Sequence, residues 1–126
     1  MTQEPITVVI CDDVPELRRL LRAALEEDGE MTVVGEAGDG REAIEVIQRL
    51  QPQIAVLDLS MPELDGLEAI PLIHQVSLPT EIVVFSGFEE KRVAEVALRL
   101  KASRYVRKGA PLEELRTAVK DLARAA

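Results

Sequence analysis

The chain has 126 residues, 47% of them hydrophobic, and its 23 acidic and 15 basic side chains give a formal net charge of −8. This length and composition are typical of one globular domain, and the acidic balance argues against direct nucleic-acid binding, which usually needs a basic face. No apolar run is long enough to cross a bilayer, and residues 1–5 lack the features of a secretory signal. The single cysteine, Cys11, excludes an internal disulfide. We therefore expect a cytoplasmic protein without membrane contact.

Short apolar runs alternate with longer segments of helical spacing along the whole chain. The short runs are rich in β-branched residues and predict buried strands at Ile6–Cys11, Met31–Gly35, Ile54–Leu59, Ile82–Phe85 and Arg104–Val106. The longer segments place apolar residues three and four positions apart, which predicts helices at Pro15–Asp28, Gly40–Leu50, Gly66–Val76, Glu89–Lys101 and Pro111–Ala125. Strand and helix therefore alternate five times.

Residues at the segment boundaries predict how the helices begin. Asp13 shortly before Pro15 predicts an N-cap with proline in the first turn. Asp39 followed by Glu42 is typical of a capping box. Pro71 lies inside the third helical segment, where it predicts a kink or a later helix start.

Five strand–helix repeats predict an α/β fold, a five-stranded parallel sheet with helices on both faces. Right-handed crossovers and the common order for five strands favour a flavodoxin-like, doubly wound (βα)5 arrangement, with the sheet order 2-1-3-4-5. We expect residues 1–126 to form this one domain. Ligands bind such sheets at the carboxyl ends of neighbouring strands where the order reverses, here strands 1 and 3.

Chemically reactive side chains lie at or just after the carboxyl ends of four predicted strands: Asp12, Asp13, Asp58, Ser86 and Lys108. Carboxylates held this close repel one another unless a cation neutralises them, and such oxygen ligands suit Mg²⁺. A metal ion beside a carboxylate, with an ammonium and a hydroxyl opposite, suits phosphoryl transfer. The central position of Asp58 makes it the candidate nucleophile, while Asp12 and Asp13 are better placed to hold the metal.

These residues stand in the segments VVICDDVPELRRLL, IAVLDLSMPELDGLEAI, IVVFSGF and YVRKGAPLEEL. In this order they resemble the receiver domain of bacterial two-component response regulators, over about residues 6–123. The sequence of the last segment is most similar to that of the NarL/FixJ (LuxR-type) subgroup. The combination is specific, although a pair of aspartates alone would carry little weight.

The resemblance implies a magnesium-dependent phosphoryl transfer. Asp58 corresponds to the aspartate that takes a phosphoryl group from the phosphohistidine of a sensor histidine kinase. Asp13 corresponds to the direct Mg²⁺ ligand and Asp12 to an acid that acts largely through water. The backbone carbonyl of Ser60 is expected to supply another metal ligand.

The resemblance also implies a conformational relay. Ser86 corresponds to the hydroxyl that turns toward the phosphoryl group, and Lys108 to the lysine that pairs with it. Tyr105 corresponds to an aromatic residue that moves inward, which changes the face made by the fourth helix, fifth strand and fifth helix. The outcome would be control of an output such as transcription. A homodimer formed on phosphorylation and a DNA-binding effector domain fit this scheme, although the 126 residues include no helix-turn-helix segment.

One departure from the family pattern, two ordinary residue interpretations and two rival functions accompany this interpretation. Gly109 follows Lys108 where the family often has proline, so we expect no cis bond there. His74 is interpreted as an ordinary surface residue and Cys11 as a buried core residue.

A magnesium-dependent phosphatase of the haloacid-dehalogenase type is a rival function, but Ser60 occupies the position where that family has its second acid. A binding-only pseudo-receiver is the remaining alternative, and we expect no enzyme beyond self-phosphorylation and self-dephosphorylation.

Overall fold

The computed structural model describes residues 4–87 and 91–125. In chain order its elements are β1 (Ile6–Cys11), α1 (Pro15–Glu26), β2 (Met31–Ala37), α2 (Gly40–Leu50), β3 (Ile54–Leu57), α3 (Gly66–Val76), β4 (Glu81–Ser86), α4 (Lys91–Arg99), β5 (Arg104–Arg107) and α5 (Leu112–Ala125). The expected start of the fourth helix at Glu89 lies outside the described residues. Among those described, no helix is long and apolar enough to cross a membrane.

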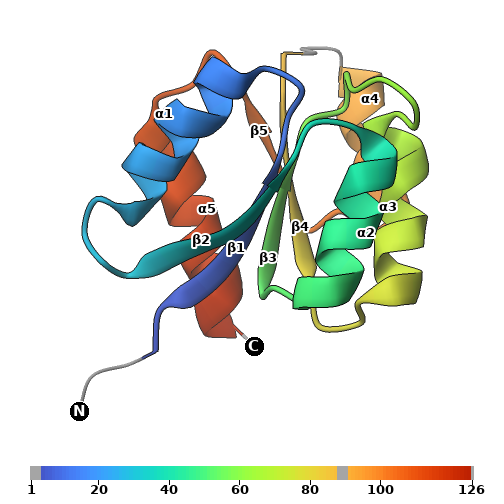
Figure 1. Ribbon diagram of the computed structural model, residues 1–126. Helices are drawn as coiled ribbons and strands as arrows, with labels where there is room; N and C mark the ends of the chain where they lie inside the picture. Colours follow the sequence, from blue (N-terminus) through green and yellow to red (C-terminus); the bar gives the residue numbers. More distant parts are fainter. Residues whose placement is uncertain (1–3, 88–90, 126) are drawn as a thin grey trace.

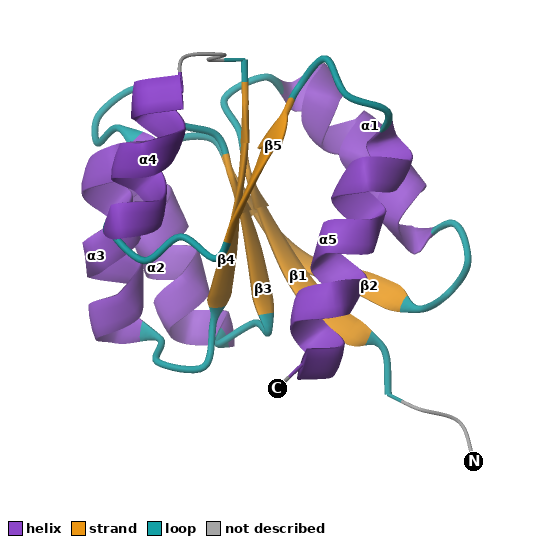
Figure 2. Cartoon of the chain, turned by 180° about the vertical axis from the view of Figure 1, so that it is seen from behind, coloured by secondary structure: helices purple, strands orange, loops and turns teal. Residues whose placement is uncertain are grey.

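The five strands form one parallel sheet in the order β2-β1-β3-β4-β5. Helices α1 and α5 cover one face, and α2, α3 and α4 cover the other (Figures 1 and 2). The predicted flavodoxin-like α/β fold and its strand order are therefore confirmed. The carboxyl ends of the five strands lie at one edge of the sheet, as parallel strands require.

The three central strands, β1, β3 and β4, are buried on both faces over most of their length, which explains why they read as continuous apolar runs. Successive residues alternate between two cores: Val8 and Ile10 pack on the side of α1 and α5, whereas Val9 and Cys11 pack on the other side. All four residues of β3 are buried, so the central strand has no solvated face. This rigid centre fixes the direction in which the carboxyl ends of β1 and β3 point.

Four strands differ from the sequence prediction, β4 by one residue at each end, β5 by one residue at its carboxyl end, and β2 and β3 by two. β3 ends at Leu57, so Leu59 lies in the following loop although it is buried and joins the core. β2 continues past Gly35 to Ala37, and its pairing with β1 shifts register between Val8 and Val9. Apolar content alone did not reveal these ends. Leu59 is buried although it does not pair as part of a strand. In β2, a bulge allows the pairing with β1 to continue beyond Gly35.

The helix starts are partly as predicted. Asp39 caps α2 through the backbone N–H of Glu42, at 2.8 Å. The prediction that Asp13 caps α1 is wrong, because Val14 occupies the N-cap position without a side-chain cap. The backbone N–H of Val14 instead donates to Asp12 Oδ1 at 2.9 Å. A turn closed by Asp12 replaces the cap and leaves Asp13 outside it.

Pro71 does not delay the start of its helix, which is continuous from Gly66 to Val76. The cap is Asp65, whose side chain accepts from the backbone N–H of Glu68 at 2.9 Å. Pro71 is exposed, so its ring meets solvent rather than the core. The early cap and the buried face of α3 outweigh the backbone hydrogen bond that proline removes.

Candidate functional site

Strand register brings the acidic residues together. Cys11 and Leu57 are partners in the β1–β3 ladder, so the residues after them leave the sheet side by side. The backbone N–H of Asp58 donates to the carbonyl of Cys11 at 2.9 Å, which extends the ladder by one residue. Asp12 and Asp58 therefore lie next to each other at the carboxyl edge of the sheet.

The carboxylates form one compact cluster with a lysine. Oxygen atoms of Asp12, Asp13 and Asp58 lie within 4.8 Å of one another. Asp12 and Asp58 are each only 2% exposed, whereas Asp13 is exposed to solvent. Lys108 Nζ lies 2.8 Å from Asp12 Oδ2 and 3.3 Å from Asp58 Oδ2. The structure thus gathers four of the residues that the sequence singled out.

Each buried carboxylate uses one oxygen for its own loop and turns the other toward Lys108. Asp12 Oδ1 accepts from the N–H of Val14, and Asp58 Oδ1 accepts from the N–H of Ser60 at 3.1 Å. These local bonds fix both side chains. Both Oδ2 atoms therefore face the same ammonium, and an oxygen of the exposed Asp13 lies within 4.8 Å of both carboxylates.

Burial and charge pairing act in opposite directions on the ionisable groups of this cluster. Burial raises the pKa of Asp58, and the nearby Asp12 charge adds to this, while the Ser60 N–H and Lys108 act in the opposite direction and leave the pKa above its ordinary value. Burial lowers the pKa of Lys108, but its hydrogen bond to Asp12 and the charges of both aspartates outweigh burial and raise it. Lys108 is therefore a cation at neutral pH.

The residues present fit a magnesium ion. Three carboxylates converge on one point, and Lys108 supplies a single compensating charge. The donor set consists of oxygens, with the exposed Asp13 on the solvent side, which suits an ion that keeps several of its waters. Asp12 Oδ2 is fully buried, and a carboxylate oxygen in that position is stabilised by a nearby cation.

Two further predicted residues, Ser86 and Tyr105, lie on neighbouring strands. Ser86 ends β4, is fully buried, and its carbonyl accepts from the backbone N–H of Lys108 at 2.9 Å. Tyr105 pairs with Val84 in the β4–β5 ladder, is half-buried and packs against the core beneath α2, α3 and α4. Ser86 and Tyr105 thus lie on the paired strands β4 and β5.

His74 and Cys11 have structural surroundings, in line with the sequence interpretation. His74 Nε2 lies 2.9 Å from the carbonyl of Lys101 and joins α3 to the end of α4. Cys11 is 1% exposed, and burial raises the pKa of its thiol to about 12. Every peptide bond in residues 4–87 and 91–125 is trans, including the one after Lys108.

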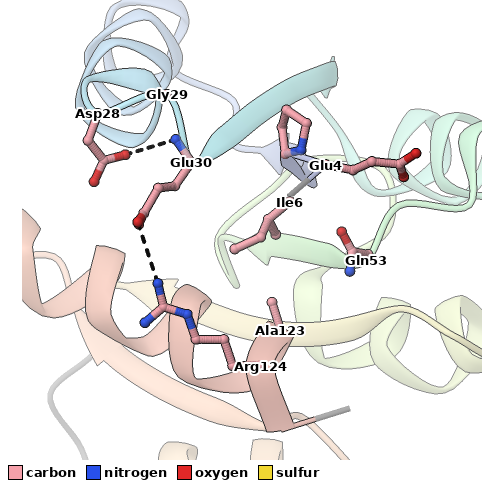
Figure 3. A pocket seen from close by; sticks show the side chains of 9 residues that line it. Glu4, Ile6, Asp28, Gly29, Glu30, Gln53, Ala123 and Arg124 are labelled. Atoms are coloured by element: carbon pink, nitrogen blue, oxygen red, sulfur yellow. Dashed lines mark hydrogen bonds and ion pairs between the residues drawn. The ribbon is translucent and has the colours of Figure 1, made fainter. Parts of the chain in front are cut away.

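A cavity of about 700 Å³ lies at the opposite, amino-terminal edge of the sheet (Figure 3). Its wall carries Asp28, Glu30, Gln53 and Arg124. The N–H of Glu30 donates to Asp28 Oδ1 at 3.1 Å, and Arg124 Nη2 lies 3.5 Å from Glu30 Oε1. Because Asp28, Glu30 and Arg124 pair with one another and Gln53 pairs with Thr7, we place the functional site at the carboxylate cluster instead.

Gly40 supports the loop that leaves the site, a contact that the sequence prediction did not include. Its N–H donates to the carbonyl of Pro62 at 3.3 Å. A Cβ atom built on Gly40 would lie 1.9 Å from the carbonyl oxygen of Leu64, which is backbone and cannot rotate away. The start of α2 and the loop after Asp58 therefore pack together at a distance that only glycine permits.

We expect Gly40→Ala to destabilise the protein by roughly 1–3 kcal/mol, since the loop must move to accept the methyl group. Urea unfolding monitored by circular dichroism measures the change. Gly109→Ala is the matched control, because a Cβ there would meet no described atom within 4 Å. Equal stability of the two variants would contradict this packing.

The raised pKa of Asp58 also predicts how its ionisation affects stability. The stabilising contribution is complete below the ordinary value of 3.8 and is lost as pH rises through the higher folded pKa. In magnesium-free buffer at neutral pH, Asp58→Asn should therefore be more stable than wild type.

Thermal unfolding of both proteins across acidic to neutral pH measures this difference. The two midpoints should converge in acid and separate as pH rises. A wild type more stable than the variant at neutral pH in the presence of a chelator would contradict the assigned electrostatics.

The sequence profile of the response regulator receiver domain matches residues 8–120. Among curated proteins, the nitrate/nitrite response regulator protein NarL of Escherichia coli is 37% identical over 113 residues, which are 90% of this chain and 52% of that protein. Protein-glutamate methylesterase/protein-glutamine glutaminase 4 of Myxococcus xanthus is 40% identical over 81% of this chain and 29% of its own length. The chain thus spans between about a third and half of these relatives.

Solved structures give a concordant result. The signal receiver domain of the response regulator NarL from Mycobacterium tuberculosis superposes with a TM-score of 0.92 at 34% identity, over 98% of this chain and all of that one. The response regulator domain of CheB from Thermotoga maritima gives a TM-score of 0.89 at 30% identity, over 96% and 98% of the two chains. The similarity to NarL proteins agrees with the NarL/FixJ resemblance of the sequence.

Proposed function

Because this chain belongs to the response regulator receiver domain family, we propose that Asp58 accepts a phosphoryl group from the phosphohistidine of a sensor histidine kinase. The observation that carries the proposal is the convergence of Asp12, Asp13, Asp58 and Lys108 in one pocket. The whole chain, residues 1–126, then acts as a single receiver domain. Its phosphorylation state controls a signalling output.

In the proposed reaction, an oxygen of the Asp58 carboxylate attacks phosphorus as the phosphorus–nitrogen bond of the phosphohistidine breaks. The electron pair of that bond stays on the imidazole nitrogen, which then takes up a proton. The product is an acyl phosphate on Asp58. Oδ2 is the expected attacking atom, because Oδ1 already accepts from the Ser60 N–H.

Asp12, Asp13, Asp58 and the backbone carbonyl of Ser60 are the residues that would hold Mg²⁺. When bound, the ion offsets negative charge on the phosphoryl oxygens. Lys108 contributes a second positive charge, since its ammonium already lies 3.3 Å from Asp58 Oδ2. Chain and ion together leave the phosphoryl oxygens paired with cationic groups.

The relay would run from Asp58 to the face made by α4, β5 and α5. A phosphoryl group adds about −1.5 to −2 charges and three acceptor oxygens, which gives Lys108 and Ser86 new partners. Only contacts that differ between the two states can shift their populations. A backbone hydrogen bond joins Lys108 to Ser86. Tyr105 lies on β5, the strand that directly precedes Lys108.

We expect Lys108→Ala to take up a phosphoryl group yet fail to change the surroundings of Tyr105. NMR of labelled tyrosine, before and after phosphorylation, measures this. In wild type the Tyr105 signal should shift, and in the variant the shift should be lost because the ammonium that follows the phosphoryl group is missing. An unshifted wild-type signal would contradict the relay.

The proposed partners and output follow from the same role. A histidine kinase in the cytoplasm supplies the phosphoryl group, and phosphorylation drives either a homodimer or the response of a DNA-binding effector domain. Relatives named as transcriptional regulatory proteins support transcription as the output. The methylesterase activity in one relative's name concerns a protein of which this chain matches 29%, and we assign none to this chain.

Intact mass after incubation with a small acyl-phosphate donor tests the proposal. With Mg²⁺ present, the purified chain should gain the mass of one phosphoryl group, and a chelator should prevent the gain. No gain under either condition would favour a binding-only pseudo-receiver. Continuous release of phosphate from an ester substrate would favour a phosphatase instead.

A further inference from the structure

Arg18 connects α1 to the backbone beneath the acidic cluster. Its Nη1 donates to the backbone carbonyl of Asp12 at 2.6 Å, and its Nε pairs with Glu36 Oε1 at 3.1 Å. The side chain is 20% exposed, so most of it is enclosed. A planar guanidinium held at two points has a fixed orientation, which a flexible ammonium would not have.

Glu36 holds this guanidinium from the neighbouring strand. It lies near the end of β2, and its two oxygens bind two arginines of α1, with Oε2 lying 2.8 Å from Arg22 Nη2. Because both oxygens are occupied, the carboxylate itself is fixed. The pair therefore links β2, α1 and the end of β1.

The Asp12 carbonyl matters because it belongs to the peptide group that joins Asp12 to Asp13. The N–H of Asp12 donates to the carbonyl of Ala37 at 3.0 Å, and its side chain binds the N–H of Val14. The Arg18 bond to the carbonyl fixes the plane of the following peptide. That plane sets the position from which the exposed Asp13 side chain reaches the cluster.

We propose that Arg18 is a positioning residue for the Asp12–Asp13 pair, held in place by Glu36, and that it thereby raises the affinity of the site for a divalent cation. This inference rests on the proposed magnesium site. Arg18 touches neither ion nor phosphoryl group. It acts through the backbone that carries two of the carboxylates.

The charge of Arg18 and its positioning role predict opposite changes in Mg²⁺ affinity when Arg18 is replaced. The guanidinium is a positive charge near a cation site, so its loss by charge alone would tighten Mg²⁺ binding. Loss of positioning would weaken binding, and substitutions of groups that orient metal ligands typically cost about 10–100-fold in affinity. The sign of the change therefore separates the two effects.

The test is calorimetric titration of the unphosphorylated chain with Mg²⁺ for wild type and Arg18→Met. We expect Arg18→Met to bind about tenfold more weakly. Arg19→Met is the matched control, because Arg19 is the next residue on the same helix and is exposed. It loses the same charge and should bind as tightly as wild type, or slightly more tightly.

Arg18→Lys keeps the charge but not the two-point contact, and we expect several-fold weaker binding. If Arg18→Met does not fold, as judged by circular dichroism, the Arg18→Lys comparison with wild type decides. Affinities equal to or tighter than wild type for the folded variants would overturn the inference. A wild type that itself fails to bind Mg²⁺ would instead overturn the proposed function.

Glu36→Gln adds a check on the mechanism. Introduced alone, it should weaken Mg²⁺ binding, since the amide holds Arg18 less firmly than a carboxylate does. Introduced together with Arg18→Met, it should add little, because its partner is already gone. Fully additive effects would contradict a role for Glu36 through Arg18.

Discussion

Replacement of Asp58 by asparagine is expected to abolish phosphoryl uptake from a small acyl-phosphate donor. The amide nitrogen cannot act as the nucleophile, and the remaining amide oxygen lacks the charge of a carboxylate. The side chain keeps its size, so the buried position should remain filled and the chain folded. Intact mass spectrometry of wild type and variant, each with Mg²⁺, measures the result.

Asp121→Asn provides the control for this experiment. It makes the same chemical change on an exposed residue of α5, far along the chain from the cluster. It should take up one phosphoryl group as wild type does. Uptake by Asp58→Asn at the wild-type level would mean that another side chain is the acceptor.

Replacement of Asp13 by asparagine should weaken Mg²⁺ binding by at least tenfold. Affinity for hard divalent ions depends on the number of charged oxygen ligands, and this change removes one charge from the cluster. Asp13 is exposed and does not cap α1, so its loss should leave the unfolding midpoint nearly unchanged. Calorimetric titration and thermal unfolding separate the two effects.

Two outcomes would contradict this assignment of Asp13. Unchanged Mg²⁺ affinity would mean that Asp13 does not contribute to the cation site. A large loss of stability without Mg²⁺ would mean that the side chain has a structural role that its exposure does not suggest. The stability of Asp58→Asn, expected to rise, provides a useful contrast because Asp58 is buried.

The fold was predictable because its signals are local and repeated. Buried parallel strands read as short apolar runs, helices read as spaced apolar residues, and handedness rules then leave few sheet orders. Helices such as Gly40–Leu50 and Gly66–Val76 were predicted with the bounds that the structure shows. Caps that lie within one segment, such as Asp39 with Glu42, were equally accessible.

Boundaries that depend on tertiary contacts were less accessible. Leu59 reads as part of a strand because it is apolar, but it is buried in a loop after β3 has ended at Leu57. The N-cap of α1 was misassigned because Asp12 closes the turn from one residue earlier than expected. In both cases the local sequence allowed two boundaries for the element. Contacts in the folded structure, burial for Leu59 and a hydrogen bond for Asp12, determine which one occurs.

The convergence of Asp12, Asp13, Asp58 and Lys108 followed from their positions after strands whose ends meet at one edge. The supporting contacts did not follow. The Arg18 side chain contacts both the Asp12 carbonyl and Glu36. Gly40 packs against Leu64, which is distant from it in the sequence. Such contacts depend on helix rotation and loop path, which sequence spacing does not specify.

Chemical mapping of the phosphorylated residue tests the central claim most directly. Borohydride reduces an aspartyl phosphate to homoserine, so peptide mass spectrometry after phosphorylation, reduction and digestion identifies the acceptor. We predict conversion at Asp58, dependent on Mg²⁺ during the reaction with the donor. Conversion at another aspartate, or at Asp58 equally well in the presence of a chelator, would contradict the account.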